Sequence, residues 1–456
     1  MKQRHSIQLS LLVIVDALLL YGALFLALKI RYAGLPFDET VPLNNHLIPF
    51  TIIFFFWIVF FGASGLYNLH FTKNTKIFAF RLIRVMVSNV VVAIVIFYLI
   101  PLAIEPRRNL LLIAVLSTIG IFIWRYLYNA LIIHAPTSRV LFFGVTAEAE
   151  RLAEYLQKNP QLGLSPVAFM STDGNGSDHS SLPHFSSPDQ LAQILDEYNI
   201  EIIVVLREIK ENKIFVSALF QVIKRGIRTI EFQSFYEMIT GKIPLSLIGE
   251  VWFLENLIGI RRRVYEFSKR FLDIALSGLL LIPVLIAYPF IALAIKLNSP
   301  GPVFYGQKRV GRNGKEFRVI KYRSMVKDAD TIPGVKGDGP DLRHTKVGMI
   351  LRRNYLDELP QIINILKGEM SFVGPRPERP EYVKELKEKI PFYEMRLLVT
   401  PGITGWAQIH MENDASVEDA PEKMQYDLYY IKNRSFVLDL LISLKTAFTL
   451  VRRQGR

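Results

Sequence analysis

Four apolar segments lie in the first 135 residues, and they constrain the fold of this chain more than any other feature. They span residues 7–28, 48–66, 86–104 and 110–133. A segment of about 20 apolar residues is long enough to cross a hydrocarbon core of roughly 30 Å as a helix. We therefore expect a four-helix transmembrane domain over residues 1–135, embedded in a lipid bilayer.

The charges beside these segments predict which side of the membrane each end occupies. Lys2 and Arg4 precede the first segment, a basic loop separates the second from the third, and Arg139 follows the fourth. Basic residues concentrate on the cytoplasmic side, so the N-terminus is expected inside the cell, and four crossings return the chain there. The loop with Arg107 and Arg108 is the one exception, because it is basic although this topology places it outside the cell. The first segment is too long for a cleaved signal peptide.

Composition agrees with membrane segments that alternate with soluble parts. The 456 residues are too many for one ordinary core, and a hydrophobic content of 51% stands beside a charged content of 21%. With no cysteine, the chain has no disulfide, no thiolate catalysis and no cysteine-zinc site. The net charge of +13 is not read as nucleic-acid binding, because the basic residues cluster beside apolar segments and no nucleic-acid-binding motif occurs. Anionic lipid and phosphate substrates explain the charge better.

After Arg139 the pattern changes to short apolar runs separated by amphipathic stretches. Expected strands cover residues 140–144, 166–170 and 201–206, and expected helices cover residues 147–158 and 214–225. Strands that alternate with helices predict a parallel-sheet α/β domain, placed at residues 136–260, with a loop at 171–187. Gly144 is not followed by the further glycines of a dinucleotide cradle, so a scaffold role is expected.

A fifth apolar segment, about residues 271–297, carries basic residues on both flanks. Positive charge on both sides argues that both ends stay in the cytoplasm. Pro283 removes a helical hydrogen bond near the middle and could bend the segment so that it enters and leaves by the same face, and Pro289 is a second candidate. An ordinary spanning helix remains the alternative.

Two adjacent carboxylates, Asp357 and Glu358, point to chemistry on a phosphate. A carboxylate can attack phosphorus if cations offset its repulsion from the anionic substrate. Arg352, Arg353 and Arg376 could supply that offset, and the prolines on either side of Arg376 should hold it on a stiff turn. The alternative is that Asp357 only caps a helix that begins at Glu358.

Further basic residues lie on an expected strand over residues 317–323. Lys321 and Arg323 should point to one face, because side chains alternate along a strand with a period of two. That face could meet a nucleotide, or it could be a solvated basic strand. Gln307 and Arg309 belong to a hairpin region and either shape the site or contact the nucleotide or sugar.

Over about the last 190 residues the chain resembles the bacterial sugar transferases, the polyprenyl-phosphate hexose-1-phosphate transferases of the monotopic phosphoglycosyl transferase superfamily. The resemblance rests on motifs in the family's order and spacing. They are Lys269–Asp273, Gly301–Tyr305, Gln307–Gly311, Lys321–Met325, Leu356–Gln361, Gly374–Glu378, Pro401–Gln408 and Tyr426–Tyr430.

This resemblance implies a fold and a reaction. Residues 261–456 would form a mixed α/β catalytic domain with a re-entrant membrane helix, and the middle domain would be the Rossmann-like domain of the longer members. The enzyme would transfer hexose-1-phosphate from a UDP-sugar, commonly UDP-glucose or UDP-galactose, to undecaprenyl phosphate, and would release UMP. The step would begin exopolysaccharide, capsule or O-antigen synthesis at the cytoplasmic face of the bacterial inner membrane.

The resemblance also implies roles for the motif residues. Asp357 would be the nucleophile, and Glu358 a metal ligand or positioning group, with Mg²⁺ held by both carboxylates. Arg352 and Arg376 would hold the phosphates, with Arg353 as an alternative to the former. Thr404 and Gln408 match a late loop and could contact the sugar, although residues 409–413 depart from the family pattern. The motif of Tyr426, Asp427, Tyr429 and Tyr430 indicates either packing or substrate contact.

Partners and rival functions complete the expectations. A homodimer is expected, with downstream glycosyltransferases as further partners, and the transferred hexose is not specified. One rival is a non-catalytic membrane assembly protein of the same fold. The other is a membrane glycosyltransferase that releases UDP instead of UMP.

Overall fold

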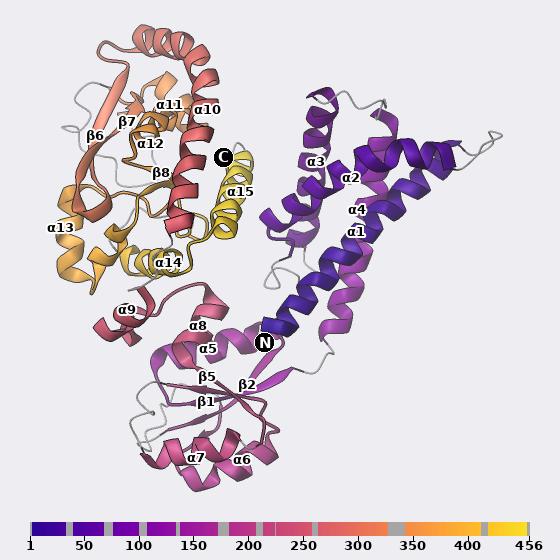
Figure 1. The fold of residues 1–456 in the computed structure, drawn as a ribbon, viewed down its shortest axis with the longest axis vertical. Coiled ribbons are helices and arrows are strands. Elements are labelled where there is room, and N and C mark those ends of the chain that lie inside the picture. The colour runs from indigo at the N-terminus through magenta and orange to yellow at the C-terminus, as the bar shows by residue number, and fades with distance from the viewer. Residues whose placement is uncertain are drawn as a thin grey trace. The chain divides into compact units, whose positions relative to one another are not determined.

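The computed structural model of the protein describes residues 2–32, 40–67, 76–99, 107–133, 137–171, 182–206, 213–223, 225–257, 263–326, 343–411 and 418–453. The chain divides into two compact units, Met1–Phe235 and Tyr236–Arg456. The first contains four long helices and a parallel sheet, and the second contains a long helix with a mixed α/β domain (Figure 1).

The N-terminal helices are α1 (Lys2–Tyr32), α2 (Thr40–Ala63), α3 (Lys76–Leu99) and α4 (Arg107–Ile133). Among the described residues of this part, Ser10–Tyr32 and Asn109–Tyr128 are long and apolar enough to cross a membrane, while the apolar stretch His46–Gly62 is shorter. Helix α3 begins ten residues before the predicted apolar segment, because its basic first turns are also good helix formers. Residues 100–104 of that prediction lie outside the described residues.

Three contacts show that α1 and α4 run antiparallel. Arg31 donates to Asn109 Oδ1 (2.5 Å), and Arg125 Nη2 donates to Asp16 Oδ2 (2.6 Å). Between them Leu19 lies beside Gly120, so residue numbers rise along one helix as they fall along the other. The start of α1 and the end of α4 therefore lie at the same end of the pair, as an even number of crossings requires. Asp16 and Arg125 are buried completely.

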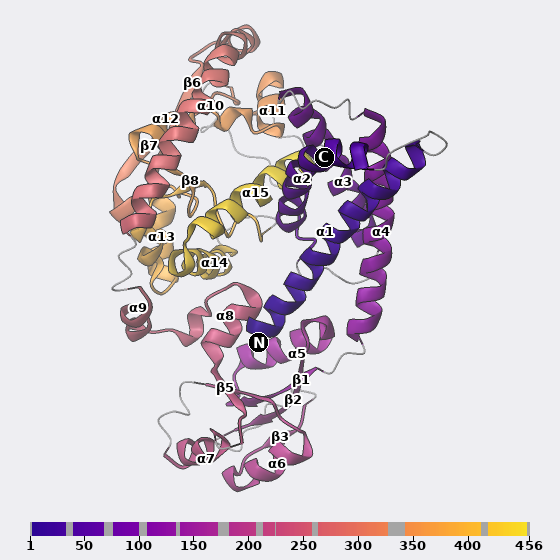
Figure 2. The same ribbon diagram turned by 45° about the vertical axis from the view of Figure 1, so that its right-hand side comes forward.

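The sheet of the first unit has the parallel architecture predicted from the sequence. Its strands are β1 (Ser138–Phe143), β2 (Leu164–Met170), β3 (His184–Phe185), β4 (Ile202–Val205) and β5 (Arg228–Glu231), all parallel in the order β3-β2-β1-β4-β5. Helices α6 (Leu191–Glu197) and α7 (Lys213–Ile223) cover one face and α5 (Ala147–Lys158) the other (Figures 1 and 2). The predicted loop at 171–187 contains β3, which its turn-rich sequence hid.

The core of this sheet explains why apolar runs dominated its sequence. Strand β4 is buried at every position, and Phe142 of β1 stacks on Phe169 of β2 with ring centroids 5.2 Å apart. Strands covered on both faces lose the alternation of an amphipathic strand. Thr146 accepts a hydrogen bond from Ala149 N and caps α5 directly after β1.

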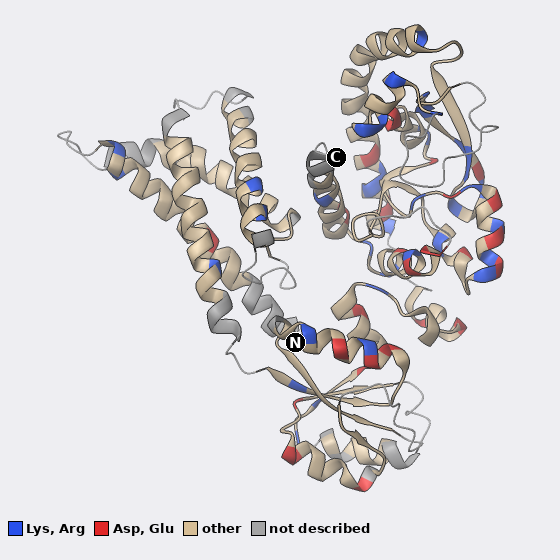
Figure 3. Cartoon of the chain, turned by 180° about the vertical axis from the view of Figure 1, so that it is seen from behind, with Lys and Arg blue, Asp and Glu red and all other residues tan. Residues whose placement is uncertain are grey.

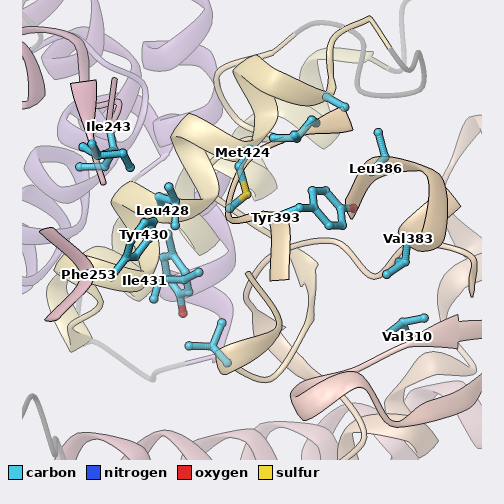
Figure 4. Packing of buried hydrophobic residues seen from close by; sticks show 14 of the residues in the cluster. Ile243, Phe253, Val310, Val383, Leu386, Tyr393, Met424, Leu428, Tyr430 and Ile431 are labelled. Atoms are coloured by element: carbon cyan, nitrogen blue, oxygen red, sulfur yellow. The ribbon is translucent and has the colours of Figure 1, made fainter. Parts of the chain in front are cut away.

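The second unit begins with a segment that the sequence assigned to the middle domain. It contains the end of α8 (Phe232–Thr240) and α9 (Glu250–Leu257). Ile243, Trp252 and Phe253 enter the same hydrophobic cluster as Met424 and Leu428 (Figure 4). We call residues 236–257 the docking segment. The predicted boundary at 260/261 stays a prediction, but these residues pack with the C-terminal unit.

The second unit also contains one long helix, α10 (Arg263–Asn298), and the helices and strands of an α/β domain that contacts it. They are the antiparallel hairpin β6 (Phe304–Val310) and β7 (Glu316–Tyr322), α11 (Lys346–Arg353), the 3₁₀ turn η8 (Leu356–Glu358), α12 (Gln361–Lys367), β8 (Ser371–Val373), α13 (Pro380–Lys389), β9 (Gly402–Thr404), α14 (Ala420–Asn433) and α15 (Phe436–Arg453). Strands β8 and β9 pair in parallel. The predicted hairpin and strand at 317–323 are confirmed to within one residue.

Helix α10 is also long and apolar enough to cross a membrane, and only 6% of its apolar window is buried. Near its start Arg270 donates to the carbonyl oxygens of Ile365 (2.5 Å) and Leu366 (2.7 Å), and near its end Ile295 joins a cluster that includes Leu359. A straight helix would hold Arg270 and Ile295 about 37 Å apart. Leu359, packed against that cluster, and Ile365 are only six positions apart in the chain, a span of at most about 21 Å even if extended.

The ribbon of α10 accordingly bends (Figure 1). Pro283 and Pro289 both lie inside it, and a proline inside a helix is a common cause of a kink. Both ends of the helix contact one α/β domain.

Candidate active site

Asp357 and Glu358 lie in η8, a single 3₁₀ turn between α11 and α12. Tyr355, just before it, has a left-handed backbone with φ of 55°, which a residue other than glycine adopts only rarely. The predicted helix cap is wrong: α12 begins at Gln361 after Pro360, and Asp357 does not cap it. Proline fits the start of a helix because it has no N–H, so the helix starts one turn later than expected.

Glu358 joins the two carboxylates to the basic strand. Lys321 Nζ lies 2.6 Å from its Oε1, and Arg376 Nη2 lies 3.3 Å from the same oxygen. Burial by itself raises the pKa of Glu358, but Arg376 and Lys321 outweigh it and hold the pKa at about 2, below the ordinary 4.5. Glu358 is therefore ionised, and it fixes two cations at the turn.

Asp357 has the opposite electrostatic character. Its side chain is 7% exposed, and burial raises its pKa above 3.8 although Lys321 and Arg352 oppose that rise; the charge of Glu358 adds to it. A carboxylate of raised pKa is a stronger nucleophile than an ordinary one once it is deprotonated. Two neighbouring acids thus have environments that push their pKa values apart.

Arg352 and Arg353 occupy the last turn of α11 and are exposed. Arg352 Nη1 lies 3.1 Å from His344 Nε2, and its charge reaches Asp357. The helix can pack closely because Gly348 has no side chain: a Cβ there would lie 1.8 Å from the carbonyl oxygen of Ser324. A larger residue would move α11 and Arg352 away from the turn.

Arg376 projects from the loop 374–378, as the flanking prolines predicted. Its carbonyl oxygen accepts a hydrogen bond from Arg396 Nη2 (2.9 Å). Gly374 lies so close to the next loop that a Cβ would be 2.4 Å from the carbonyl oxygen of Thr400, and its N–H donates to Thr404 O (2.8 Å). The loop is thus held from both sides, and the guanidinium is aimed at Glu358.

Gln307 and Arg309 lie on β6 and brace this loop. Arg309 donates to the carbonyl oxygen of Pro377 (2.9 Å) and to Gln307 Oε1 (2.7 Å). These contacts fit the interpretation that the pair shapes the site. A direct contact to nucleotide or sugar stays a prediction.

Arg323 is not brought to Glu358. Strand β7 ends at Tyr322, and the buried guanidinium of Arg323 donates to the carbonyl oxygens of Ser299 and Pro300, both at 2.7 Å. Arg323 thus satisfies two carbonyl oxygens of the chain directly after α10. The period-two argument placed it beside Lys321 because the sequence does not reveal where the strand stops.

Thr404 and Gln408 make contacts within the domain. Thr404 Oγ1 lies 2.6 Å from Thr446 Oγ1, and Gln408 Nε2 donates to Ile403 O (3.1 Å). Their predicted contact to sugar stays a prediction. Trp406, between them, donates from Nε1 to Gly241 O (2.9 Å) of the docking segment.

Sequence reasoning missed a buried charge network behind the Arg376 loop. Glu378 accepts from Lys423 Nζ (2.6 Å) and lies 3.6 Å from Arg309, and Arg396 lies 2.8 Å from Asp427. The nearby tyrosines at 426 and 430 are buried, so this motif packs. Glu378 ends a recognised motif, which was a usable signal, whereas Arg396 stands alone in the sequence.

A divalent ion suits the site only together with substrate. In the described part of the chain, no three His, Asp or Glu side chains come together as a metal cluster. Mg²⁺ commonly needs one or two carboxylates and completes its shell with waters and phosphate oxygens. Asp357 and Glu358 offer two carboxylates on one turn, so the residues present fit that mode.

Two family models match the chain. One, described as bacterial sugar transferase, matches residues 264–453, and the other, described as a CoA-binding domain, matches residues 62–219. The first covers α10 from its second residue onward and every residue of the Asp357 and Glu358 site described above. The second runs from the end of α2 into α7.

Curated relatives match over part of their length. The UDP-N-acetylgalactosamine-undecaprenyl-phosphate N-acetylgalactosaminephosphotransferase of Aeromonas hydrophila is 40% identical over 48% of this chain and 51% of its own. The UDP-glucose:undecaprenyl-phosphate glucose-1-phosphate transferase of Xanthomonas campestris pv. campestris is 32% identical over 68% and 66%. The undecaprenyl-phosphate galactose phosphotransferase of Salmonella typhimurium is 30% identical over 73% and 71%. The chain thus spans less than two thirds of the first two relatives.

Proposed function

Because the chain belongs to the bacterial sugar transferase family, we propose that it transfers hexose-1-phosphate from a UDP-sugar to undecaprenyl phosphate and releases UMP. The relatives are named for this chemistry with three different sugars, so the hexose is left open. One observation carries the proposal: η8 presents a buried carboxylate of raised pKa beside a second carboxylate that holds two cations. The product would enter exopolysaccharide, capsule or O-antigen synthesis.

The first half-reaction uses Asp357 as nucleophile. A carboxylate oxygen forms a bond to the β-phosphorus of the UDP-sugar, and the bond from that phosphorus to the bridging oxygen breaks. The bridging oxygen leaves with UMP, and the sugar phosphate stays on Asp357 as an acyl phosphate. Glu358 projects in a different direction, about 120 degrees away in a 3₁₀ turn, so it is not aimed at the same phosphorus.

The second half-reaction regenerates the carboxylate. A phosphate oxygen of the lipid attacks the same phosphorus, and the bond to Asp357 breaks. The sugar is then linked to the lipid through a diphosphate. No net proton transfer to the enzyme is needed, because both leaving groups are stable anions.

The cations act in both halves. An ammonium has three N–H donors and a guanidinium five, so Lys321 and Arg376 can each bond more than one oxygen. Glu358 orients both cations at the turn, and we expect phosphate oxygens to bond them there. Arg352 adds positive charge near Asp357. Mg²⁺ held by Asp357 or Glu358 would supply further neutralisation of the diphosphate.

A cytoplasmic location follows from the need for a nucleotide-activated sugar. We propose that residues 1–135 form a four-helix membrane domain and that α10 is re-entrant. The antiparallel contacts of α1 with α4 and the contact of both ends of α10 with one α/β domain support this arrangement. The middle domain is proposed as a scaffold, and homodimerisation and downstream glycosyltransferases remain expectations.

The test is direct detection of the adduct and of UMP. Protein in lipid nanodiscs with a panel of UDP-sugars and no lipid acceptor should carry hexose phosphate on the peptide with Asp357. Asp357→Asn should lose the adduct and at least about 10³-fold of turnover, since a nucleophile is removed. Glu385→Gln, at an exposed acid of α13, is the matched control and should behave as wild type.

Other outcomes separate the rival functions. Release of UDP instead of UMP would identify an ordinary glycosyltransferase. Absence of any nucleotide product from the whole panel, in protein that remains folded, would favour a non-catalytic assembly role. Activity that survives chelation would remove Mg²⁺ from the proposal but not Asp357.

A further inference from the structure

Three aromatic rings form a continuous stack between the membrane helix and the catalytic turn. Tyr288 of α10 stacks on Phe304, the first residue of β6, with centroids 5.6 Å apart and planes 3° apart. Phe304 stacks on Tyr322, the last residue of β7, at 5.5 Å and 19°. We call these three residues the aromatic ladder. Offset stacking at such distances is favourable for aromatic pairs.

The inner end of the ladder meets the catalytic turn. Tyr322 is buried and belongs to a cluster that includes Leu356 and Leu359, the residues on either side of Asp357 and Glu358. The residue before it, Lys321, points to the opposite face of the strand and reaches Glu358. The two faces of the strand at the end of β7 therefore each contribute one side chain that holds η8 in place.

The outer end of the ladder is open. Tyr288 is 37% exposed and Phe304 39%, although both carry large apolar rings. Tyr288 belongs to α10, whose apolar window is almost entirely exposed in the protein and is suited to lipid. The ladder thus runs from a surface that lipid can cover to the residues on either side of Asp357 and Glu358.

We propose that the aromatic ladder binds the first isoprene units of the polyprenyl phosphate acceptor and so delivers its phosphate to Asp357 and Lys321. This inference rests on the proposed function. The acceptor has an apolar, unsaturated chain and an anionic head, and the ladder joins an exposed apolar surface to a cationic site in the same order. A UDP-sugar has no apolar chain, so the ladder acts only in the second half-reaction.

The competing explanation is membrane anchoring, because aromatic residues are common at the edges of a bilayer. An anchor and an acceptor site differ in a measurable way. An anchor affects both half-reactions alike, through the position or amount of folded protein in the membrane. An acceptor site affects only the step that consumes the lipid.

The experiment measures the two half-reactions separately in full-length protein in nanodiscs. Exchange of labelled UMP into UDP-sugar reports the first and needs no lipid acceptor, and transfer to undecaprenyl phosphate reports the second. For Phe304→Ala we expect exchange within about twofold of wild type and transfer at least about tenfold lower, with a raised KM for the lipid. Tyr288→Leu, which removes the outer ring from an exposed position, should show the same pattern.

Phe290→Ala is the matched control. Phe290 also lies on α10 and is 73% exposed, but it makes none of the ladder contacts, so both half-reactions should stay near wild type. An acceptor phosphate with a single isoprene unit should lose less from Phe304→Ala than undecaprenyl phosphate does. The unfolding temperature of each variant checks its fold.

Equal losses in exchange and transfer, or equal losses in Phe304→Ala and Phe290→Ala, would overturn the acceptor site. Unchanged transfer in Phe304→Ala and Tyr288→Leu would overturn it as well. Failure of the proposed function has a different signature, since wild-type protein would then show no exchange and no transfer.

Discussion

Two regions of this protein each bury a carboxylate against a guanidinium, and they do so in opposite ways. In the N-terminal helices Asp16 and Arg125 form a one-to-one pair in which both side chains are at most 1% exposed. In the C-terminal unit Glu358 faces both Lys321 and Arg376, which are 22% and 31% exposed. Figure 3 shows how few charged residues the long N-terminal helices carry beside those of the C-terminal unit.

The difference separates a charge pair that holds helices together from one that is suited to a ligand. The buried pair of Asp16 and Arg125 has no net charge. Replacement of one partner leaves the other as an unpaired ion in an apolar environment. Lys321, Arg376 and Arg352 act on the two carboxylates of the turn, so the cations outnumber the carboxylates by one. Lys321 and Arg376 are partly exposed to solvent, where an incoming diphosphate can reach them.

The largest effect on stability is expected from breaking the buried pair. Arg125→Met leaves Asp16 buried without its partner, which typically costs about 3–5 kcal/mol. Unfolding of the protein in mild detergent should therefore begin at a much lower temperature, and the yield of folded protein should fall. The double variant Asp16→Leu with Arg125→Met should recover most of the loss. A single variant as stable as wild type would show that the pair contributes nothing to the helix packing.

A somewhat smaller effect, on rate instead of stability, is expected at the open group. Arg376→Met should lower UMP release by about 10²–10³-fold, because it removes a hydrogen-bond donor to the negative charge that develops on the phosphate in the transition state. Arg379→Met, two loop positions beyond Pro377, is the matched control. If Arg376→Met lowered the unfolding temperature but left the rate per folded molecule intact, the cluster would be structural like the first.

The smallest expected effect is on acid stability. Because Lys321 and Arg376 hold the pKa of Glu358 at about 2, its contribution to folding is present above the ordinary pKa of 4.5 and is lost as pH falls from there towards 2. Glu358→Gln should flatten that part of the profile of unfolding free energy against pH. An unchanged acid limb would mean that Glu358 is not held ionised by its neighbours.

Local patterns predicted much of this site, and long-range contacts account for what they missed. The strand that carries Lys321 and the stiff loop that carries Arg376 followed from alternation and from flanking prolines. The partner that each cation finds did not, since Glu358 and Lys321 are 37 positions apart. Arg323 is a basic residue two positions after Lys321, as the period-two pattern requires of a residue on the same face. Strand β7 ends at Tyr322, however, and Arg323 donates to the carbonyl oxygens of Ser299 and Pro300 after α10.

The fold shows the same division. Apolar periodicity located the parallel sheet and α10, because burial on two faces or in lipid leaves a strong signal in composition. The network of Glu378, Arg396 and Lys423 left a signal only at Glu378, which ends a motif, because Arg396 and Lys423 each resemble a surface charge in the sequence. Only the tertiary fold brings them together behind Arg376.

The docking segment has a practical consequence for anyone who shortens this chain. A fragment that starts at 261, where the sequence predicts the start of the catalytic domain, would lose Ile243, Trp252 and Phe253, which form part of its hydrophobic core. The indole of Trp406 would also lose its acceptor at Gly241. A fragment that starts at residue 236 should remain soluble in detergent and folded. A fragment that starts at residue 261 should expose apolar side chains of this cluster and aggregate.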